Sequence, residues 1–227
     1  MRAIVFAGAL AVSAVVLTGC RLESLGGPTE ESVVSYDVGD KVSALEVYAG
    51  SGDIVVTGSD RSGIRVTETM QWRNRKPEAR HQVNGEWLRL DYECPHGTCS
   101  VSYRVEVPKG TQVKPETGSG DITLRGLTGR IEVTAGSGEV EASGLGAGET
   151  TAETGSGNME FKYGAVPGDV DLRTGSGNIS VTVPDASYDI TTDTGSGDTR
   201  VDVAQDPAAP SKIAVETGSG NIRVLPG

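Results

Sequence analysis

The sequence predicts an all-β fold, a flattened β-solenoid of about 19-residue strand-turn-strand coils with a β-meander insertion near the N-terminal end. Two observations carry this prediction. The tripeptide Gly-Ser-Gly, followed by an acid or an amide, occurs seven times, with first glycines at positions 50, 118, 136, 155, 175, 195 and 218. On both sides of most of these tripeptides apolar residues alternate with polar ones, which is the period of a half-buried strand.

Each repeat therefore indicates a strand, a tight Gly-Ser-Gly corner, a second strand and a connection of variable length. Glycine suits the corner because it adopts positive φ at no steric cost, and the acid or amide that follows can hydrogen-bond nearby backbone. Stacking such units about 4.8 Å apart buries a continuous core that one unit could not form alone. Because periodicity does not distinguish parallel from antiparallel pairing, an antiparallel hairpin sandwich is the alternative architecture.

A gap of 68 residues between the first and second tripeptides marks the insertion, at about residues 61–110. Its strand-like runs are Ile64–Trp72, Trp87–Tyr92 and Val101–Val107, with turns at Asn84-Gly85 and between Cys94 and Cys99. We expect a meander that covers the N-terminal end of the stack.

The C-terminal residues Leu225-Pro226-Gly227 directly follow a strand. An unpaired strand edge there would be a site of self-association, blunted only by Pro226, which lacks a backbone donor.

The N-terminus has the pattern of a lipoprotein export signal. A basic start and a short apolar run lead to Leu17-Thr18-Gly19-Cys20, which resembles the lipobox in which the cysteine is acylated and becomes the mature N-terminus. The predicted division is a signal peptide over 1–19, a lipid-anchored tether over 20–42 and the solenoid domain over 43–227. It places the protein at the extracytoplasmic face of the cell membrane. An ordinary secreted protein with a cysteine near its cleavage site is the alternative.

Composition excludes several classes of function. The net charge of −11 opposes binding to phosphate backbones, so no nucleic-acid partner is expected. The two histidines, His81 and His96, both lie in the insertion, which leaves the repeats without a histidine-based zinc site or Ser-His-Asp arrangement. No cofactor and no metal are expected.

Three stretches carry a family resemblance: residues 52–60 (GDIVVTGSD), residues 103–110 (YRVEVPKG) and the serial Thr-Gly-Ser-Gly-Asp/Asn-Ile. Over about residues 43–227 the chain resembles the bacterial putative-adhesin domain family of unknown function. The resemblance implies a β-solenoid-like domain, often exported or membrane-tethered, and brings no catalytic residues.

Cys94 and Cys99 flank a four-residue turn that can bring their side chains to bonding distance, and outside the cytoplasm a disulfide is the expected outcome. The alternative is a metal site that adds His96, but it supplies only three close ligands.

Carboxylates follow four of the corners: Asp53, Asp121, Glu139 and Asp198. They could form a calcium ladder, but Asn158, Asn178 and Asn221 interrupt it, and like charges stacked one coil apart repel. Structural corners are the favoured interpretation.

One basic cluster stands out in the acidic chain, and it forms the candidate partner-binding loop. Its members are Trp72, Arg73, Arg75, Lys76 and Arg80, with His81 beyond. It could recognise an anionic cell-wall polymer, lipid headgroups or another envelope protein, with Trp72 as an anchor. The alternative is a solvated hairpin loop.

Together these features predict a lipid-anchored extracytoplasmic surface protein, a non-catalytic adhesin-like or structural module. A carbohydrate-active enzyme that uses paired carboxylates on a β-helical scaffold is one alternative. An envelope sensing or regulatory partner is the other.

Overall fold

The computed structural model describes residues 13–14, 29–39, 42–95 and 98–227. Over these residues the chain is all β, as predicted, with 21 strands. A helix long and apolar enough to cross a membrane is not found among them.

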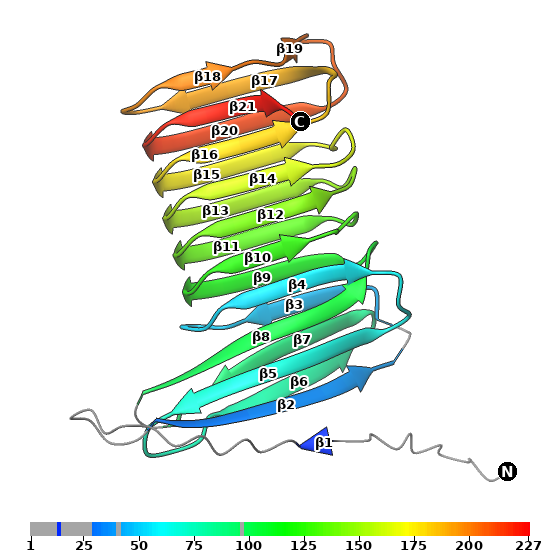
Figure 1. Cartoon of the computed structure of the whole chain (residues 1–227), viewed down its shortest axis with the longest axis vertical. Coiled ribbons are helices and arrows are strands. Elements are labelled where there is room, and N and C mark those ends of the chain that lie inside the picture. The colour runs from blue at the N-terminus through cyan, green and yellow to red at the C-terminus, as the bar shows by residue number, and fades with distance from the viewer. Residues whose placement is uncertain (1–12, 15–28, 40–41, 96–97) are drawn as a thin grey trace, which may run out of the picture.

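The strands form two large sheets, named A and B here, that run along the whole molecule (Figure 1). Sheet A consists, in spatial order, of β1 (Ser13–Ala14), β2 (Glu30–Val38), β5 (Ile64–Trp72), β8 (Cys99–Pro108), β4 (Ile54–Ser59), β10 (Ile122–Arg125), β12 (Val140–Leu145), β14 (Met159–Tyr163), β16 (Ile179–Val183), β21 (Ile222–Pro226) and β18 (Thr199–Val201). Sheet B consists of β19 (Ala204–Gln205), β17 (Ser187–Thr194), β20 (Lys212–Ser219), β15 (Val170–Ser176), β13 (Thr150–Ser156), β11 (Ile131–Ser137), β9 (Gln112–Ser119), β3 (Ala44–Tyr48), β7 (Trp87–Glu93) and β6 (Glu78–Asn84).

Each coil passes from a strand of sheet B through a Gly-Ser-Gly corner to a strand of sheet A. Neighbouring coils pair in parallel and in register: Ile122 lies between Ile54 and Val140, its equivalents in the adjacent coils. The inward residues are apolar and buried, and they form one continuous core between the sheets. The parallel pairing confirms the solenoid and excludes the antiparallel sandwich.

The third residue of each corner must be glycine because successive corners are in backbone contact. Gly157 has φ +149°, and a Cβ built on it would lie far inside contact distance of the Gly138 carbonyl oxygen. Gly177 and Gly220 meet the corner before them in the same way. The tripeptide therefore repeats for a steric reason, and the contact fixes the coil-to-coil spacing at the corners.

The acid or amide after six of the seven corners accepts a hydrogen bond from the next coil in the stack. The Asp121 amide donates to Asp53 Oδ1 (3.1 Å), and the Glu139 amide donates to Asp121 Oδ1 (2.8 Å). The Asn178 amide donates to Asn158 Oδ1 (2.9 Å) in the same arrangement. These side chains thus connect the backbones of successive corners, which is the structural role favoured above over a calcium ladder.

Buried or half-buried threonines complete the corners from the inside. Thr217 Oγ1 donates to the Gly177 carbonyl (3.0 Å), and Thr194 Oγ1 donates to the Gly220 carbonyl (2.9 Å). A corner carbonyl left without a partner inside the protein would cost about 1–3 kcal/mol. The hydroxyl at this position therefore explains why Thr precedes most of the corners.

The insertion is all β and covers the N-terminal end, but it also builds one more coil. β7 pairs in parallel with β3, and β8 pairs in parallel with β4, so β7 and β8 stack on the first coil. β5 and β6 then extend sheets A and B in antiparallel fashion. The hairpin at Asn84-Gly85 is confirmed, with Gly85 at φ +63°.

The tether prediction over 20–42 needs a correction. Residues 30–38 form β2, which pairs along its whole length with β5. The alternation of inward Val34, Tyr36 and Val38 with polar residues explains why this segment joins the sheet. Residues 20–28, with most of the predicted signal peptide, lie outside the described residues.

The prediction of an open edge at the C-terminal strand is wrong. β21 lies between β16 and β18, and β20 lies between β15 and β17, so the last coil in sequence is the second to last in the stack. Figure 1 shows β17 and β18 lying beyond β20 and β21 at this end. The edge strands are β18 in sheet A and β19 in sheet B.

The polarity of the inward side chains explains this order. The coil of β20 and β21 directs Ile213, Val215 and Ile222 inward, and all three are buried. The coil of β17 and β18 has Thr192 and Thr199 at equivalent positions, where they remain partly or fully exposed. This order buries more apolar surface than stacking in sequence order would, because the apolar coil lies inside and the polar coil lies at the end. Polar terminal repeats cap other repeat proteins in the same way.

Replacing a corner glycine should destabilise the fold strongly. We expect Gly157→Ala to lower the free energy of unfolding by about 3 kcal/mol or more, because the new methyl group would collide with the Gly138 carbonyl and φ is positive. Urea denaturation measures the change. Gly110→Ala is the matched control, since a Cβ there meets nothing within 4 Å. Equal stability of the two variants would contradict the steric role of the corner.

Candidate functional site at the N-terminal end

The structure pairs Cys94 with Cys99 in a disulfide, with Cα atoms 6.1 Å apart. Because β7 and β8 belong to different sheets, the bridge closes a corner between the sheets instead of a hairpin within one. It lies in the coil that the insertion adds, in the place that a Gly-Ser-Gly corner takes in the coil of β3 and β4. His96 and Cys20 lie outside the described residues.

Two members of the predicted basic cluster are not available to a partner in the way expected. Trp72 is only 8% exposed and packs in the core, so it is not a surface anchor. Arg80 Nε lies 2.7 Å from Asp91 Oδ1, and its Nη1 lies 3.1 Å from Glu93 Oε2. Both differences follow from strand geometry, because Trp72 occupies an inward position of β5 and Arg80 lies opposite Asp91 on the outer face.

Residues 73–76, which we call the basic loop, remain exposed at the turn from β5 to β6. Arg73 Nε donates to Thr29 Oγ1 (3.4 Å), and Lys76 Nζ donates to Ser32 Oγ (3.3 Å). Lys76 Nζ also lies 5.6 Å from the centre of the Trp72 ring. Asn74 takes φ +76° in the turn. The loop is thus attached to the core through Trp72, and it contacts the start of β2.

A cavity of about 420 Å³ lies beside this loop, between β2 and β5 of sheet A and β6 of sheet B. Its apolar lining consists of Val34, Met70, Pro77 and Ala79, and its polar lining consists of Tyr36, Glu68, Lys76, Glu78 and His81. Cavities with an apolar wall and a few convergent polar groups are the usual form of binding sites.

Glu68 is the most unusual member of this lining. It occupies an inward position of β5, between Val66 and Met70, and is only 4% exposed. The Tyr36 hydroxyl donates to Glu68 Oε1 (2.6 Å). Burial raises the pKa of the Glu68 carboxyl, while the bond from Tyr36 and the nearby His81 and Lys76 partly oppose the rise.

Two aromatic side chains surround this carboxyl. The Tyr36 ring stacks on His81 with ring centres 4.7 Å apart. Tyr103 lies opposite Glu68 on β8, is 1% exposed, and its hydroxyl has no hydrogen-bond partner among the described residues. Burial, followed by the nearby charge of Glu68, raises the Tyr103 pKa. The end of the core therefore holds a polar cluster in an otherwise apolar interior.

A buried carboxyl with a raised pKa keeps its proton to a higher pH than a free carboxyl does, and in a cavity its protonated form can act as a hydrogen-bond donor or a general acid. Glu78 is the other acidic residue of the lining. Within the described residues, no group of three or more His, Cys, Asp or Glu is placed to hold a metal ion.

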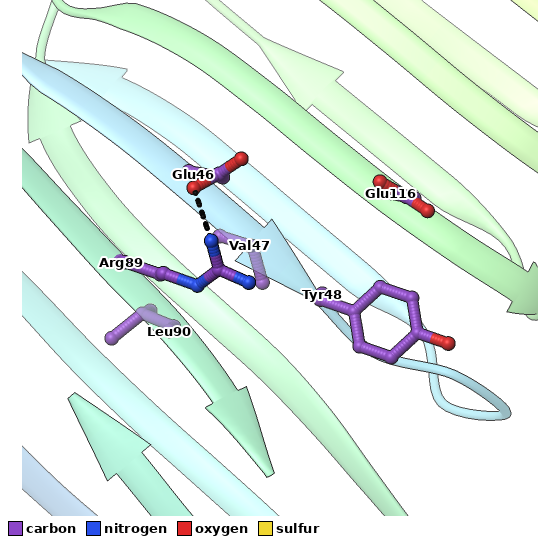
Figure 2. Close-up of a pocket in the computed structure, with 6 residues that line it drawn as sticks. All are labelled: Glu46, Val47, Tyr48, Arg89, Leu90 and Glu116. Atoms are coloured by element: carbon purple, nitrogen blue, oxygen red, sulfur yellow. Dashed lines mark hydrogen bonds and ion pairs between the residues drawn. The ribbon is translucent and has the colours of Figure 1, made fainter. Parts of the chain in front are cut away.

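A second, smaller hollow of about 240 Å³ lies over β3, β7 and β9 of sheet B (Figure 2). Arg89 Nη1 lies 3.3 Å from Glu46 Oε2, and its Nε lies 3.1 Å from Asp91 Oδ2. Tyr48 and Glu116 complete the rim that Figure 2 shows. Because its cation already has two acidic partners, this hollow is a weaker candidate than the cavity at Glu68.

The sequence analysis missed Glu68, although a signal was present. In Ile64–Trp72 every second residue is apolar except Glu68. A charged residue in the inward series of a strand is costly unless it is paired, so it marks a functional or specificity-determining position. Tyr36 was missed because its strand was assigned to the tether.

We expect Glu68→Gln to stabilise the fold at neutral pH, because the amide keeps an acceptor for Tyr36 without the cost of a buried charge. The raised pKa means that the unfolded state loses its proton first as pH rises, so wild-type stability should fall relative to the variant from about pH 4 upward. Urea denaturation at roughly pH 3 and pH 7 measures the difference. A gap between the proteins that does not change with pH would contradict this assignment.

One of the solved structures reported below supports this fold. The chain is similar to a Clostridium sporogenes structure described as a "putative cell adhesion protein", with 15% identity, a TM-score of 0.56, and coverage of 88% of this chain and 100% of that one. A "putative adhesin" from Bacteroides fragilis gives 13% identity, a TM-score of 0.48 and coverage of 85% and 97%. No curated protein matches the chain. The family model Toastrack DUF4097 matches residues 40–225, and the chain therefore belongs to the Toastrack DUF4097 family.

Proposed function

We propose that this protein is a lipid-anchored extracytoplasmic surface protein whose stack is a non-catalytic, adhesin-like interaction module. The observation that carries the proposal is the short distance in sequence between the lipobox-like Leu17–Cys20 and β2, the first strand after it, which begins at Glu30. An acylated Cys20 would hold the N-terminal end of the stack close to the membrane.

The distribution of side chains supports a binding role for the surface. The interior of the coils is filled by buried apolar residues such as Phe161, Leu172 and Ile179. The outer faces carry charged residues and threonines, several of them in ion pairs such as Lys114 with Glu132. A stack of this kind presents two long outer faces and an N-terminal end that differs from the repeats, and it suits recognition by surface contact.

Lipid attachment predicts that cells expressing the full-length chain incorporate a palmitate analogue into it. Cys20→Ala should abolish this labelling and release the protein from the membrane fraction, because the acylated side chain is lost. The double variant Cys94→Ala, Cys99→Ala is the control, and its label should be retained. Unchanged labelling of Cys20→Ala would refute the anchor.

A binding module should be retained by its partner without altering it. We expect the mature chain to bind an immobilised envelope fraction and to release no reducing sugar ends from it. Release of sugar ends that is lost in Glu68→Gln would instead favour the glycan-cleaving enzyme, with Glu68 as its acid.

A further inference from the structure

We propose that the basic loop, residues 73–76, binds the anionic lipid headgroups of the bilayer that holds the Cys20 anchor. The domain then stands on the membrane by its N-terminal end. This inference rests on the proposed function for the anchor, but its chemistry belongs to Arg73, Arg75 and Lys76.

The basic loop lies where the chain enters the folded domain. Glu30, the first residue of β2, pairs with Trp72, the last residue of β5, and the basic loop follows immediately. Arg73 Nε reaches Thr29 Oγ1, and Lys76 Nζ reaches Ser32 Oγ. The loop and the membrane-proximal segment of the chain are therefore neighbours in space.

The chain length keeps the loop within reach of the bilayer. Nine peptide steps separate Cys20 from Thr29. Fully extended, nine steps span at most about 32 Å. Because the anchor confines the loop to this distance, its local concentration at the headgroups is high and a weak interaction suffices.

The cations of the loop are exposed, and Lys76 lies near the buried Glu68, where its charge partly opposes the rise of the Glu68 pKa. Arg73 and Lys76 bond to hydroxyl groups, and no ion pair to Arg73, Arg75 or Lys76 occurs among the described residues. The nearest acids in sequence are Glu68, which is buried, and Glu78. Strand pairing places Glu30 and Glu31 opposite Trp72 and Gln71, and Glu31 accepts a bond from Gln71. Arg80, by contrast, is neutralised by Asp91 and Glu93, so it belongs to the fold and not to this surface.

The charge of the rest of the molecule favours the same orientation. Residues 112–227, which form most of the stack, contain eight Lys and Arg against 17 Asp and Glu, a net charge of −9. An anionic bilayer repels these coils and attracts the basic loop. Both interactions therefore favour the orientation in which the N-terminal end of the stack faces the membrane.

The test uses the mature chain from residue 20 with Cys20→Ser, so that binding does not depend on acylation. Flotation with vesicles measures its partition onto phosphatidylcholine alone and onto phosphatidylcholine mixed with phosphatidylglycerol, at low and high salt. We expect binding to the mixed vesicles only, lost at high salt. Each basic residue contributes about a factor of five, so Arg73→Gln, Arg75→Gln, Lys76→Gln should bind about 100-fold more weakly.

The control variant removes three cations from the outer face of sheet A: Arg125→Gln, Lys162→Gln, Arg223→Gln. It has the same net charge as the loop variant and should bind the mixed vesicles like the wild type. Thermal unfolding of both variants checks that they fold. Equal binding by the loop variant and the control would overturn the proposal. So would wild-type binding to a soluble polyphosphate but not to vesicles, which would indicate a wall polymer instead. Neither result depends on palmitate labelling, so failure of the anchor remains a separate outcome.

Discussion

The close approach of backbone to backbone at successive corners is the constraint on which the rest of the structure depends. It demands glycine where one corner meets the carbonyl of the previous one, as Gly157 meets Gly138. It also leaves backbone amides and carbonyls at the corners that need hydrogen-bond partners. On the outer side Asn158 accepts from the Asn178 amide, and on the inner side Thr217 donates to the Gly177 carbonyl. Once the corners are stacked in this way, the strands on either side are held in register, and one continuous core follows.

The polarity of the inward side chains then decides what lies at the two ends. At one end the coil of β17 and β18, with Thr192 and Thr199 inward, shields the more apolar coil of β20 and β21. At the other end, antiparallel strands β2, β5 and β6 cover the stack, and a cavity with the buried Glu68 lies among them. The repeats form a rod of nearly uniform coils, whereas the N-terminal end gathers the cavity, the basic loop and the start of the folded chain. This asymmetry favours the N-terminal end as the functional one.

The sequence alone was sufficient for the coils, because period-two alternation and a sterically required tripeptide are both local signals. It also located the disulfide between Cys94 and Cys99. It was insufficient for β2, β6 and the order of the last two coils, because these depend on which apolar surfaces compete for the same partner across long distances in sequence. Trp72 was assigned to a binding loop because basic residues follow it in the sequence. It occupies an inward position of β5, however, and this places it in the core. In a strand, the alternation of inward and outward positions decides whether a side chain is buried. The polarity of its neighbours in sequence therefore predicts its exposure poorly.

Paired cysteines on the outer face of sheet A test the stacking most directly, because they report both register and coil order. Ser180 of β16 lies directly opposite Arg223 of β21, and Arg200 of β18 lies one strand further away. The account predicts that Ser180→Cys with Arg223→Cys forms a disulfide readily under mild oxidation, while Ser180→Cys with Arg200→Cys does not. Crosslinking of the second pair and not the first would show that the coils stack in their sequence order, which would contradict the account.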